Sequence, residues 1–200
     1  MIITNNIKAC HKQKNPLIVS TMIIDSSLTF TEALADSAAP PEVLAQLVLL
    51  EVRYYSFDGK LHQGQLVINR LLQQEVAHLF ARIKALRFPV AKALPIVRYG
   101  WSDGASMADN NASGFNYRFV AGTTRLSRHA LGFALDINPR QNPVVYADGT
   151  ILPPGATYDP RQAGTLSPAS PVVREFLSRG WRWGGDFTQS KDYHHFEKAP

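Results

Sequence analysis

Apolar runs and alternating apolar and polar positions predict strands in two parts of the chain. An apolar run over residues 47–57 is followed by Asp58-Gly59 and then by a second run over 61–68. Because Asp-Gly is typical of a tight turn, we expect these runs to form a β-hairpin that begins the sheet. Residues 133–138 alternate with a period of two, which predicts a strand with Asp136 on the face opposite to its apolar neighbours.

Three stretches carry the signals of helices. Asn69 is a suitable N-cap for a helix over 70–86. The residues expected to face the core from this helix are Leu71, Leu72, Val76, Leu79, Phe80 and Ile83. A second helix is expected over 171–178, with Pro at its first position and Gly after its end. A short helix is expected over 42–47.

The stretches between these elements predict one further strand and two loops. Residues 94–99 are expected to form a strand. Residues 101–111 are rich in Gly, Ser, Asp and Asn, which predicts a loop with Asp103 and Asp109 as solvated acids. Residues 142–169 form a long irregular stretch, which either walls a functional cleft or is disordered; the sequence leaves both alternatives open.

Length and composition narrow the class of protein. Two hundred residues suit one globular domain with a sizeable core. The net charge of +5 is scattered and includes no basic run, so nucleic-acid binding is not expected. The single cysteine, Cys10, permits no internal disulfide. No apolar run approaches the roughly 20 residues of a membrane helix, so we expect no transmembrane segment.

The first part of the chain has the composition of a leader. We expect residues 1–39 to be a leader or a poorly ordered segment and 40–200 to be the domain. Three lysines precede an apolar run over 16–24, which is the order of a secretory signal. The run is short, β-branched and ended by Asp25, so a flexible leader or an edge strand is the alternative.

Four residues in the second half of the chain could form a catalytic zinc site. His129 and Asp136 lie seven positions apart with Gly132 between them, and Asp192 precedes His195 by three. Such a site needs three protein ligands, an open position and a nearby carboxylate that takes a proton from water. We therefore expect His129, Asp136 and His195 to be the ligands and Asp192 to be the base.

These residues also carry a resemblance to a known family. Ser-x-His-x-x-Gly-x-Ala-x-Asp over 127–136 and acid-x-x-His over 192–195 resemble two signatures of the D-alanyl-D-alanine carboxypeptidase (VanY-like) family of zinc peptidases. That family belongs to the fold group that includes lysostaphin and the sonic hedgehog amino-terminal domain. Residues 106–118 are similar to the family segment whose Arg faces the substrate. The resemblance extends from about Tyr54 to Glu197.

The resemblance implies a fold, a cofactor and a substrate. The expected fold is α+β, a single hedgehog-like domain in which an antiparallel sheet carries the zinc ligands and helices pack on one side. One Zn²⁺ per chain is expected. The expected substrate is the peptidoglycan stem peptide, cut as a D-alanyl-D-alanine carboxypeptidase would cut it. Arg118 is expected to bind an oxyanion or a substrate carboxylate, and Ser127 to support the site by hydrogen bonding.

Several alternatives stay open. The cleaved bond could instead be the internal L-Ala–D-Glu bond, and the chain could be a non-catalytic zinc-containing wall- or protein-binding domain. The acid-x-x-His spacing selects His195, so His194 is expected to be packed or exposed, and Glu197 to have a structural or supporting role. A peptidoglycan substrate implies the cell envelope or secretion. We expect a monomer.

Overall fold

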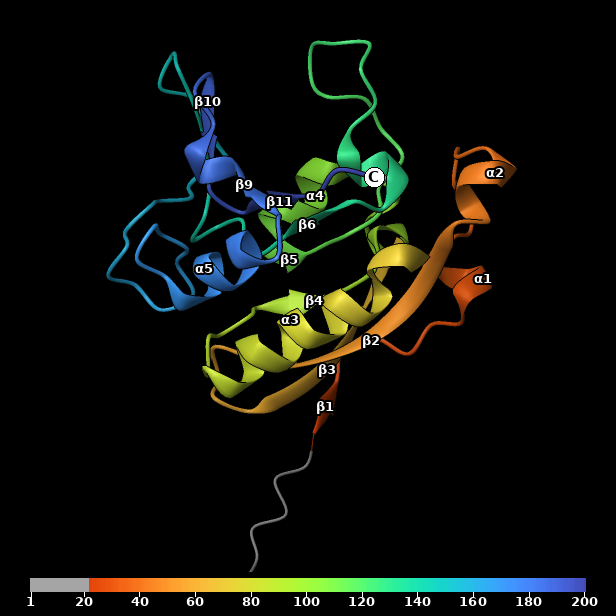
Figure 1. Ribbon diagram of the computed structural model, residues 1–200, viewed down its shortest axis with the longest axis horizontal. Helices are drawn as coiled ribbons and strands as arrows, with labels where there is room; N and C mark the ends of the chain where they lie inside the picture. The colour runs from red at the N-terminus through yellow and green to blue at the C-terminus, as the bar shows by residue number, and fades with distance from the viewer. Residues whose placement is uncertain (1–21) are drawn as a thin grey trace, which may run out of the picture.

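The longest strands form the predicted hairpin. In the computed structural model, which describes residues 22–200, β2 (Leu47–Tyr55) pairs antiparallel with β3 (Leu61–Asn69) (Figure 1). Gly59 closes the turn with a φ of +74°, a left-handed conformation that glycine adopts without steric cost. The short β1 (Ile23–Ile24) pairs in parallel with the other edge of β3. The hairpin therefore starts a three-stranded sheet.

Both faces of β3 are buried, each against a different apolar cluster. Successive side chains of a strand point to opposite faces, so neighbouring residues enter different clusters. Leu66 and Ile68 lie in the main apolar core. Val67 lies in a second cluster on the other face, together with Phe115 and with Ala33 of α1 (Phe30–Ala33). The short helix α2 (Pro41–Leu44) adds partly buried residues to this second cluster.

The helix predicted after Asn69 begins with one turn of a different kind. The Asn69 side chain accepts a hydrogen bond from the Leu71 amide and caps η1 (Arg70–Leu72), a 3₁₀ turn that leads into α3 (Gln73–Ala85). The prediction that Leu71 faces the core is wrong, since it is 74% exposed. A 3₁₀ turn has three residues per turn, so it changes the direction of Leu71 relative to an α-helix. The core residues predicted for this helix and confirmed by the structure are Leu72, Val76, Leu79, Phe80 and Ile83.

Two predictions for residues 92–112 are wrong. The expected strand over 94–99 is instead η2 (Ile96–Tyr99), preceded by the two-residue β4 (Lys92–Ala93), because Pro95 has no N–H to donate to a ladder. The expected loop contains α4 (Asp103–Ala108), whose N-terminus is capped by the Ser102 side chain. β5 (Asn111–Ala112) follows and pairs in parallel with β4.

The α+β class is confirmed, whereas the expected single antiparallel sheet is divided. Residues 22–200 contain four small sheets. One consists of β6 (Ala134–Asp136), β11 (His195–Glu197) and β9 (Arg182–Trp183), and another of β10 (Ser190–Asp192), β7 (Val144–Tyr146) and β8 (Ile151–Leu152). β6 ends early because Asn138 has a φ of +50° and Pro139 follows it. The hedgehog-like arrangement stays a prediction.

One apolar core joins the hairpin to the β6–β11–β9 sheet. Leu135 of β6 and Phe196 of β11 lie in the same cluster as Leu66 and as Phe176 of α5 (Pro171–Ser178). These apolar residues alternate along their strands with Asp136 and His195. The core therefore supports the sheet from one face, and the polar side chains lie on the other.

The rest of the chain agrees in part with the sequence. Trp181 and Trp183 are core residues and are 3% and 2% exposed. Residues 22–39 contribute β1 and α1, and the domain boundary at residue 40 stays a prediction. Cys10 and most of the predicted signal-like run lie outside the described residues. In the part that is described, no helix is both long and apolar enough to cross a membrane.

Candidate metal centre

Three predicted ligands meet at one point of the fold. His129 Nε2 lies 3.1 Å from Asp136 Oδ1 and 3.1 Å from His195 Nδ1, and the last two atoms are 3.0 Å apart. All three residues are buried. Among residues 22–200 this is the one group of His, Cys, Asp and Glu side chains close enough to hold a metal ion.

Two local features place His129. Ser127 Oγ accepts a hydrogen bond from the His129 amide at 3.2 Å and caps η3 (Arg128–Leu131), a 3₁₀ helix. Gly132 ends this helix with a φ of +71°, and a Cβ at that position would lie 2.4 Å from the Asn69 amide nitrogen. No other residue type would fit both the conformation and the space. The chain therefore turns sharply from His129 into β6.

Asp136 and His195 are placed by strand pairing. They lie directly opposite each other in the antiparallel pair of β6 and β11. Ser113 forms an antiparallel bridge with Asp136 on the other edge of β6, through N–H···O distances of 3.1 and 2.9 Å. Asp136 is thus fixed in the middle of three chain segments.

Each histidine has one ring nitrogen occupied by an acceptor. His129 Nδ1 donates to the carbonyl oxygen of Gly114, and His195 Nε2 lies 3.4 Å from Glu197 Oε2. In the neutral imidazole the other nitrogen then carries the lone pair, and in both residues this nitrogen faces Asp136 Oδ1. Hydrogen bonding of this kind is what orients metal-binding histidines.

The spacing and chemistry of the three atoms fit zinc. In a tetrahedral site with zinc–ligand distances of about 2.0–2.1 Å, the ligand atoms lie about 3.3 Å apart. The observed distances of 3.0–3.1 Å are slightly shorter. Two imidazoles and one carboxylate are also a usual donor set for a catalytic zinc ion.

The electrostatics of the triad favour positive charge at its centre. Burial raises the pKa of Asp136, but the charges of His129 and His194 and hydrogen bonds from the histidines lower it more, so the net pKa is well below the usual value. Burial lowers the pKa of His195, but hydrogen bonds to Asp136 and Glu197 outweigh this and raise it to about 10. The group thus attracts a proton, and a divalent cation would meet the same attraction.

The predicted base lies beside the triad on another sheet. Asp192 ends β10, which pairs with β7, and its side chain is 24% exposed. Its Oδ1 lies 3.1 Å from Nε2 of His194, a residue that is 3% exposed. Of the two outcomes expected for His194, the structure shows the packed one.

Arg118 lies on a segment that is hydrogen-bonded to the start of η3. Its carbonyl oxygen accepts from the Ser127 amide at 3.0 Å. Its guanidinium forms an ion pair with Asp103, with Nη2 and Oδ2 3.2 Å apart. The expectation of solvated loop acids is wrong for Asp103, which lies on α4, whereas Asp109 follows the helix and is exposed, with Lys92 2.8 Å away.

A comparison with protein families agrees with the motifs. The family model described as D-alanyl-D-alanine carboxypeptidase covers the part of the chain that holds the triad and Asp192. Residues 121–198 match this family. The resemblance inferred from the motifs is confirmed over these residues, whereas residues 54–120, including Arg118, lie outside the match. A search of curated proteins and a search of solved structures each found no match.

The match gives the triad a chemical context, because enzymes of this family are zinc-dependent in general. It therefore supports a zinc peptidase, and it contains His129, Asp136 and His195 as well as Asp192. Their individual roles as ligands and base stay predictions.

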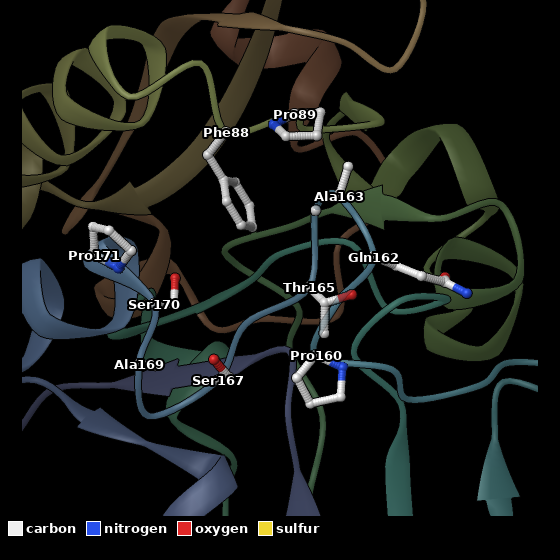
Figure 2. A pocket seen from close by; sticks show the side chains of 11 residues that line it. Phe88, Pro89, Pro160, Gln162, Ala163, Thr165, Ser167, Ala169, Ser170 and Pro171 are labelled. Carbon is white, nitrogen blue, oxygen red and sulfur yellow. The ribbon is translucent and has the colours of Figure 1, made fainter.

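A pocket of about 360 Å³ lies elsewhere on the molecule (Figure 2). It is lined by Phe88 and Pro89, which follow α3, and by residues of the 160–171 segment. None of the triad residues lines it, and neither does Asp192. The pocket is therefore separate from the candidate metal centre.

Sequence reasoning missed the backbone group that orients His129. A Cβ at Gly114 would lie 2.3 Å from the Val67 carbonyl oxygen, so only glycine allows this segment to pack against β3. The available signal was a glycine within a strand-like stretch, which often marks a close approach of two backbones. Glu197 was expected to have a structural or supporting role; its Oε2 lies 3.4 Å from His195 Nε2, and the role itself stays a prediction.

Proposed function

We propose that this protein is a zinc peptidase that hydrolyses peptidoglycan stem peptides as a D-alanyl-D-alanine carboxypeptidase. The observation that carries the proposal is the convergence of His129, Asp136 and His195 within a segment that matches this family. Three protein ligands leave one position of a tetrahedral ion open, which is typical of catalytic zinc and not of structural zinc. Asp192 supplies the additional carboxylate that a hydrolytic site needs.

Each of these four residues has a separate role in the proposed reaction. His129, Asp136 and His195 would hold the ion, which when bound supplies Lewis acidity that polarises the scissile carbonyl and lowers the pKa of water to about 7. Asp192 takes the proton of the attacking water and passes it to the leaving amine. Removing such a base typically lowers the rate by about 10²–10⁴.

Arg118 is proposed to bind an oxygen of the substrate. Its Nε is buried and has no hydrogen-bond partner among the residues from 22 onward. The side chain as a whole is 30% exposed, so the accessible part of the guanidinium can donate to an oxyanion or carboxylate of the substrate. Ser127 is proposed to act indirectly, since its hydroxyl accepts from the His129 amide.

One observation favours a second candidate, an L-alanyl-D-glutamate endopeptidase. The guanidinium of Arg118 is already paired with the Asp103 carboxylate, which balances its charge. Recognition of a free terminal carboxylate needs that charge more than donation to an oxyanion does. Cleavage of an internal bond would therefore be less affected by Asp103.

The proposed substrate also suggests where the protein acts. Peptidoglycan lies in the cell envelope, so we propose action there or after secretion. A mildly basic chain, with a net charge of +5, suits an anionic polymer.

The test combines metal analysis with product analysis. The full chain would be purified, its zinc content measured, and defined murein peptides incubated with it and followed by mass spectrometry. We expect about one zinc per chain and the loss of one terminal D-Ala. Asp192→Asn is the control: it should retain zinc and lose activity by about 10²–10⁴.

The other outcomes are equally informative. An internal cut between L-Ala and D-Glu would replace the carboxypeptidase by the endopeptidase. Zinc binding with every peptide intact would favour a non-catalytic binding domain. A folded protein that binds no zinc would refute the assignment of the metal centre.

A further inference from the structure

Asp192 has an incompletely bonded carboxylate in a crowded position. Oδ1 is buried and makes no aligned hydrogen bond within residues 22–200, although His194 Nε2 lies only 3.1 Å from it. The side chain as a whole is 24% exposed, so the exposed part lies away from Oδ1. One carboxylate oxygen therefore faces His194, and the remainder of the group can reach solvent or substrate.

His194 is itself held firmly. It is 3% exposed, and its Nδ1 lies 2.7 Å from the backbone carbonyl oxygen of Asn142. A carbonyl oxygen only accepts, so Nδ1 carries a proton and the ring orientation is fixed; Nε2 donates to a carboxylate when it is protonated as well, in the imidazolium form. This orientation points Nε2 toward Asp192 Oδ1 at 3.1 Å and toward Asp136 Oδ2 at 4.0 Å.

Asn142 is a rigid support for this contact. It is fully buried, and its side-chain amide donates to the carbonyl oxygens of Ile137, Asn138 and Gly164. Its Oδ1 accepts from the Leu166 amide at 2.6 Å. The residue that anchors His194 thus has the hydrogen-bonding capacity of its side chain filled, which fixes the position of its backbone.

A second, independent contact fixes the backbone of Asp192. A Cβ at Gly184 would lie 2.4 Å from the Asp192 carbonyl oxygen and 2.9 Å from the Asp192 Cβ. The φ of Gly184 does not lie in the left-handed region, so glycine is needed here for lack of space and not for its backbone conformation. Even one methyl group there would push Asp192 away from its place.

We propose that His194, anchored by Asn142, is the positioning residue of Asp192, and that Gly184 fixes the same residue from its backbone side. The inference rests on the proposed function, because it assigns the device that aims the proposed base. Aspartate is one methylene shorter than glutamate, so its reach depends on where the backbone and carboxylate are held. A misplacement of about 1 Å can cost about 10²-fold in rate.

The imperfect alignment of the His194–Asp192 contact is consistent with this role. Catalytic hydrogen bonds are often long or poorly aligned in the absence of substrate and tighten in the complex. His194 holds Oδ1 and leaves the other oxygen of Asp192 for the attacking water. His194 touches no reacting atom, so its effect on kcat should pass through Asp192, and the zinc content reports any effect on its other neighbour, Asp136.

The kinetic test uses the zinc-loaded full chain and a defined murein peptide. His194→Ala should lower kcat about 10–100-fold, change KM by less than about threefold, and retain zinc. His194→Gln, whose amide can still donate to Asp192, should recover a large part of kcat. His78→Ala, which removes an exposed histidine from α3, is the matched control and should leave kcat unchanged.

A double-mutant cycle isolates the pathway. In the Asp192→Asn background, His194→Ala should lower kcat no further, because the group that it positions is already disabled. Gly184→Ala should lower kcat while zinc is retained. An additive loss in the double variant, or zinc loss in His194→Ala, would overturn the proposal in favour of a general structural role.

A crystal structure of zinc-loaded His194→Ala gives a readout that needs no activity. We expect the Asp192 carboxylate to leave its wild-type position or to occupy several rotamers. An unmoved carboxylate would refute the positioning role whatever the activity. If the wild-type protein cleaves no murein peptide but Asp192 moves in the variant, the proposed function fails and the positioning role stands.

Discussion

At the scale of single residues, each histidine of the triad is oriented by an acceptor on its outer nitrogen. For His129 the acceptor is a backbone carbonyl, which no side-chain substitution removes. For His195 it is the carboxylate of Glu197, which also pairs with Arg182 at 3.1 Å. The hydrogen bond from His195 lowers the pKa of Glu197. Of the two outer partners, Glu197 is the one that mutation can test directly.

Glu197→Ala should weaken zinc binding without removing any ligand. Loss of such an outer partner typically costs about 10–100-fold in metal affinity, because the imidazole becomes less basic and less well oriented. The affinity would be measured by competition with a chromophoric chelator. Glu51→Ala, at an exposed position of β2, is the control and should leave the affinity unchanged. An unchanged affinity in Glu197→Ala would mean that Glu197 is a surface acid only.

At the scale of elements, the segment around Gly114 links β3 to the candidate metal centre. The Phe115 amide donates to the Val67 carbonyl oxygen at 2.7 Å, and the Asn116 amide donates to the His129 carbonyl oxygen at 3.1 Å. One short piece of chain therefore contacts the central hairpin on one side and η3 on the other.

Gly114→Ala should destabilise the protein and reduce zinc binding together. The added Cβ would lie 2.3 Å from the Val67 carbonyl oxygen, and overpacking of this kind typically costs about 1–3 kcal/mol. Urea unfolding and zinc content would both be measured. Gly104→Ala in α4 is the matched control, because a Cβ there meets no atom within 4 Å. It should leave zinc content unchanged. Equal behaviour of the two variants would contradict the close approach.

The first turn after Asn69 gives a second prediction at this scale. Leu71→Ala should change the free energy of unfolding by less than about 0.5 kcal/mol, since its side chain is 74% exposed. Leu72→Ala should cost about 2–5 kcal/mol, because this neighbour is 6% exposed and lies in the main core. Denaturant unfolding of both variants measures the difference. Similar losses in the two would indicate that the α-helix begins at Arg70.

The sequence was most informative where one local rule decides the structure. The Asp58-Gly59 turn, the Asn69 cap and the helical spacing after it predicted the hairpin and α3. The turn after Pro95 was missed because the proline outweighed the apolar pattern of residues 94–99, and α4 was missed because the Ser102 cap outweighed a composition typical of a loop. The division into small sheets depends on long-range pairing, which no local pattern contains.

The candidate site was predictable only in its outline. The spacing of His129, Asp136 and His195 predicted which ligands would meet, and the structure brings these residues together. The carbonyl of Gly114 and the anchor at Asn142 could not be inferred, because contacts through a backbone leave no trace in side-chain chemistry. The pairing of Arg118 with Asp103 depends on a helix that the sequence did not predict.

At the scale of the whole molecule, the candidate metal centre joins distant parts of the chain. His129 and Asp136 are seven residues apart, whereas His195 lies 59 residues beyond Asp136. The unfolded chain therefore presents the three ligands together only rarely. A metal ion that binds all three favours the folded state strongly over the unfolded one.

Zinc should therefore raise the melting temperature of the protein. At a free zinc concentration of 1,000 times Kd, binding to the folded state alone adds about 4 kcal/mol. For a domain of this size that corresponds to a rise in Tm of about 8–16 °C. Calorimetry with zinc and with a chelator measures it. Asp136→Ala should show no zinc-dependent rise in Tm. A wild-type Tm that is the same with zinc and with a chelator would contradict the assignment of the metal site.

The pairing of β6 with β11 must avoid a shift in strand register. If β11 slipped by one residue, His194 would stand opposite Asp136, so a mispaired sheet would still offer an imidazole there. The slip would also turn Phe196 out of the core, where it stacks on Phe176 with ring centroids 3.9 Å apart. The choice between two adjacent histidines is thus made by a phenyl ring on the opposite side of the sheet.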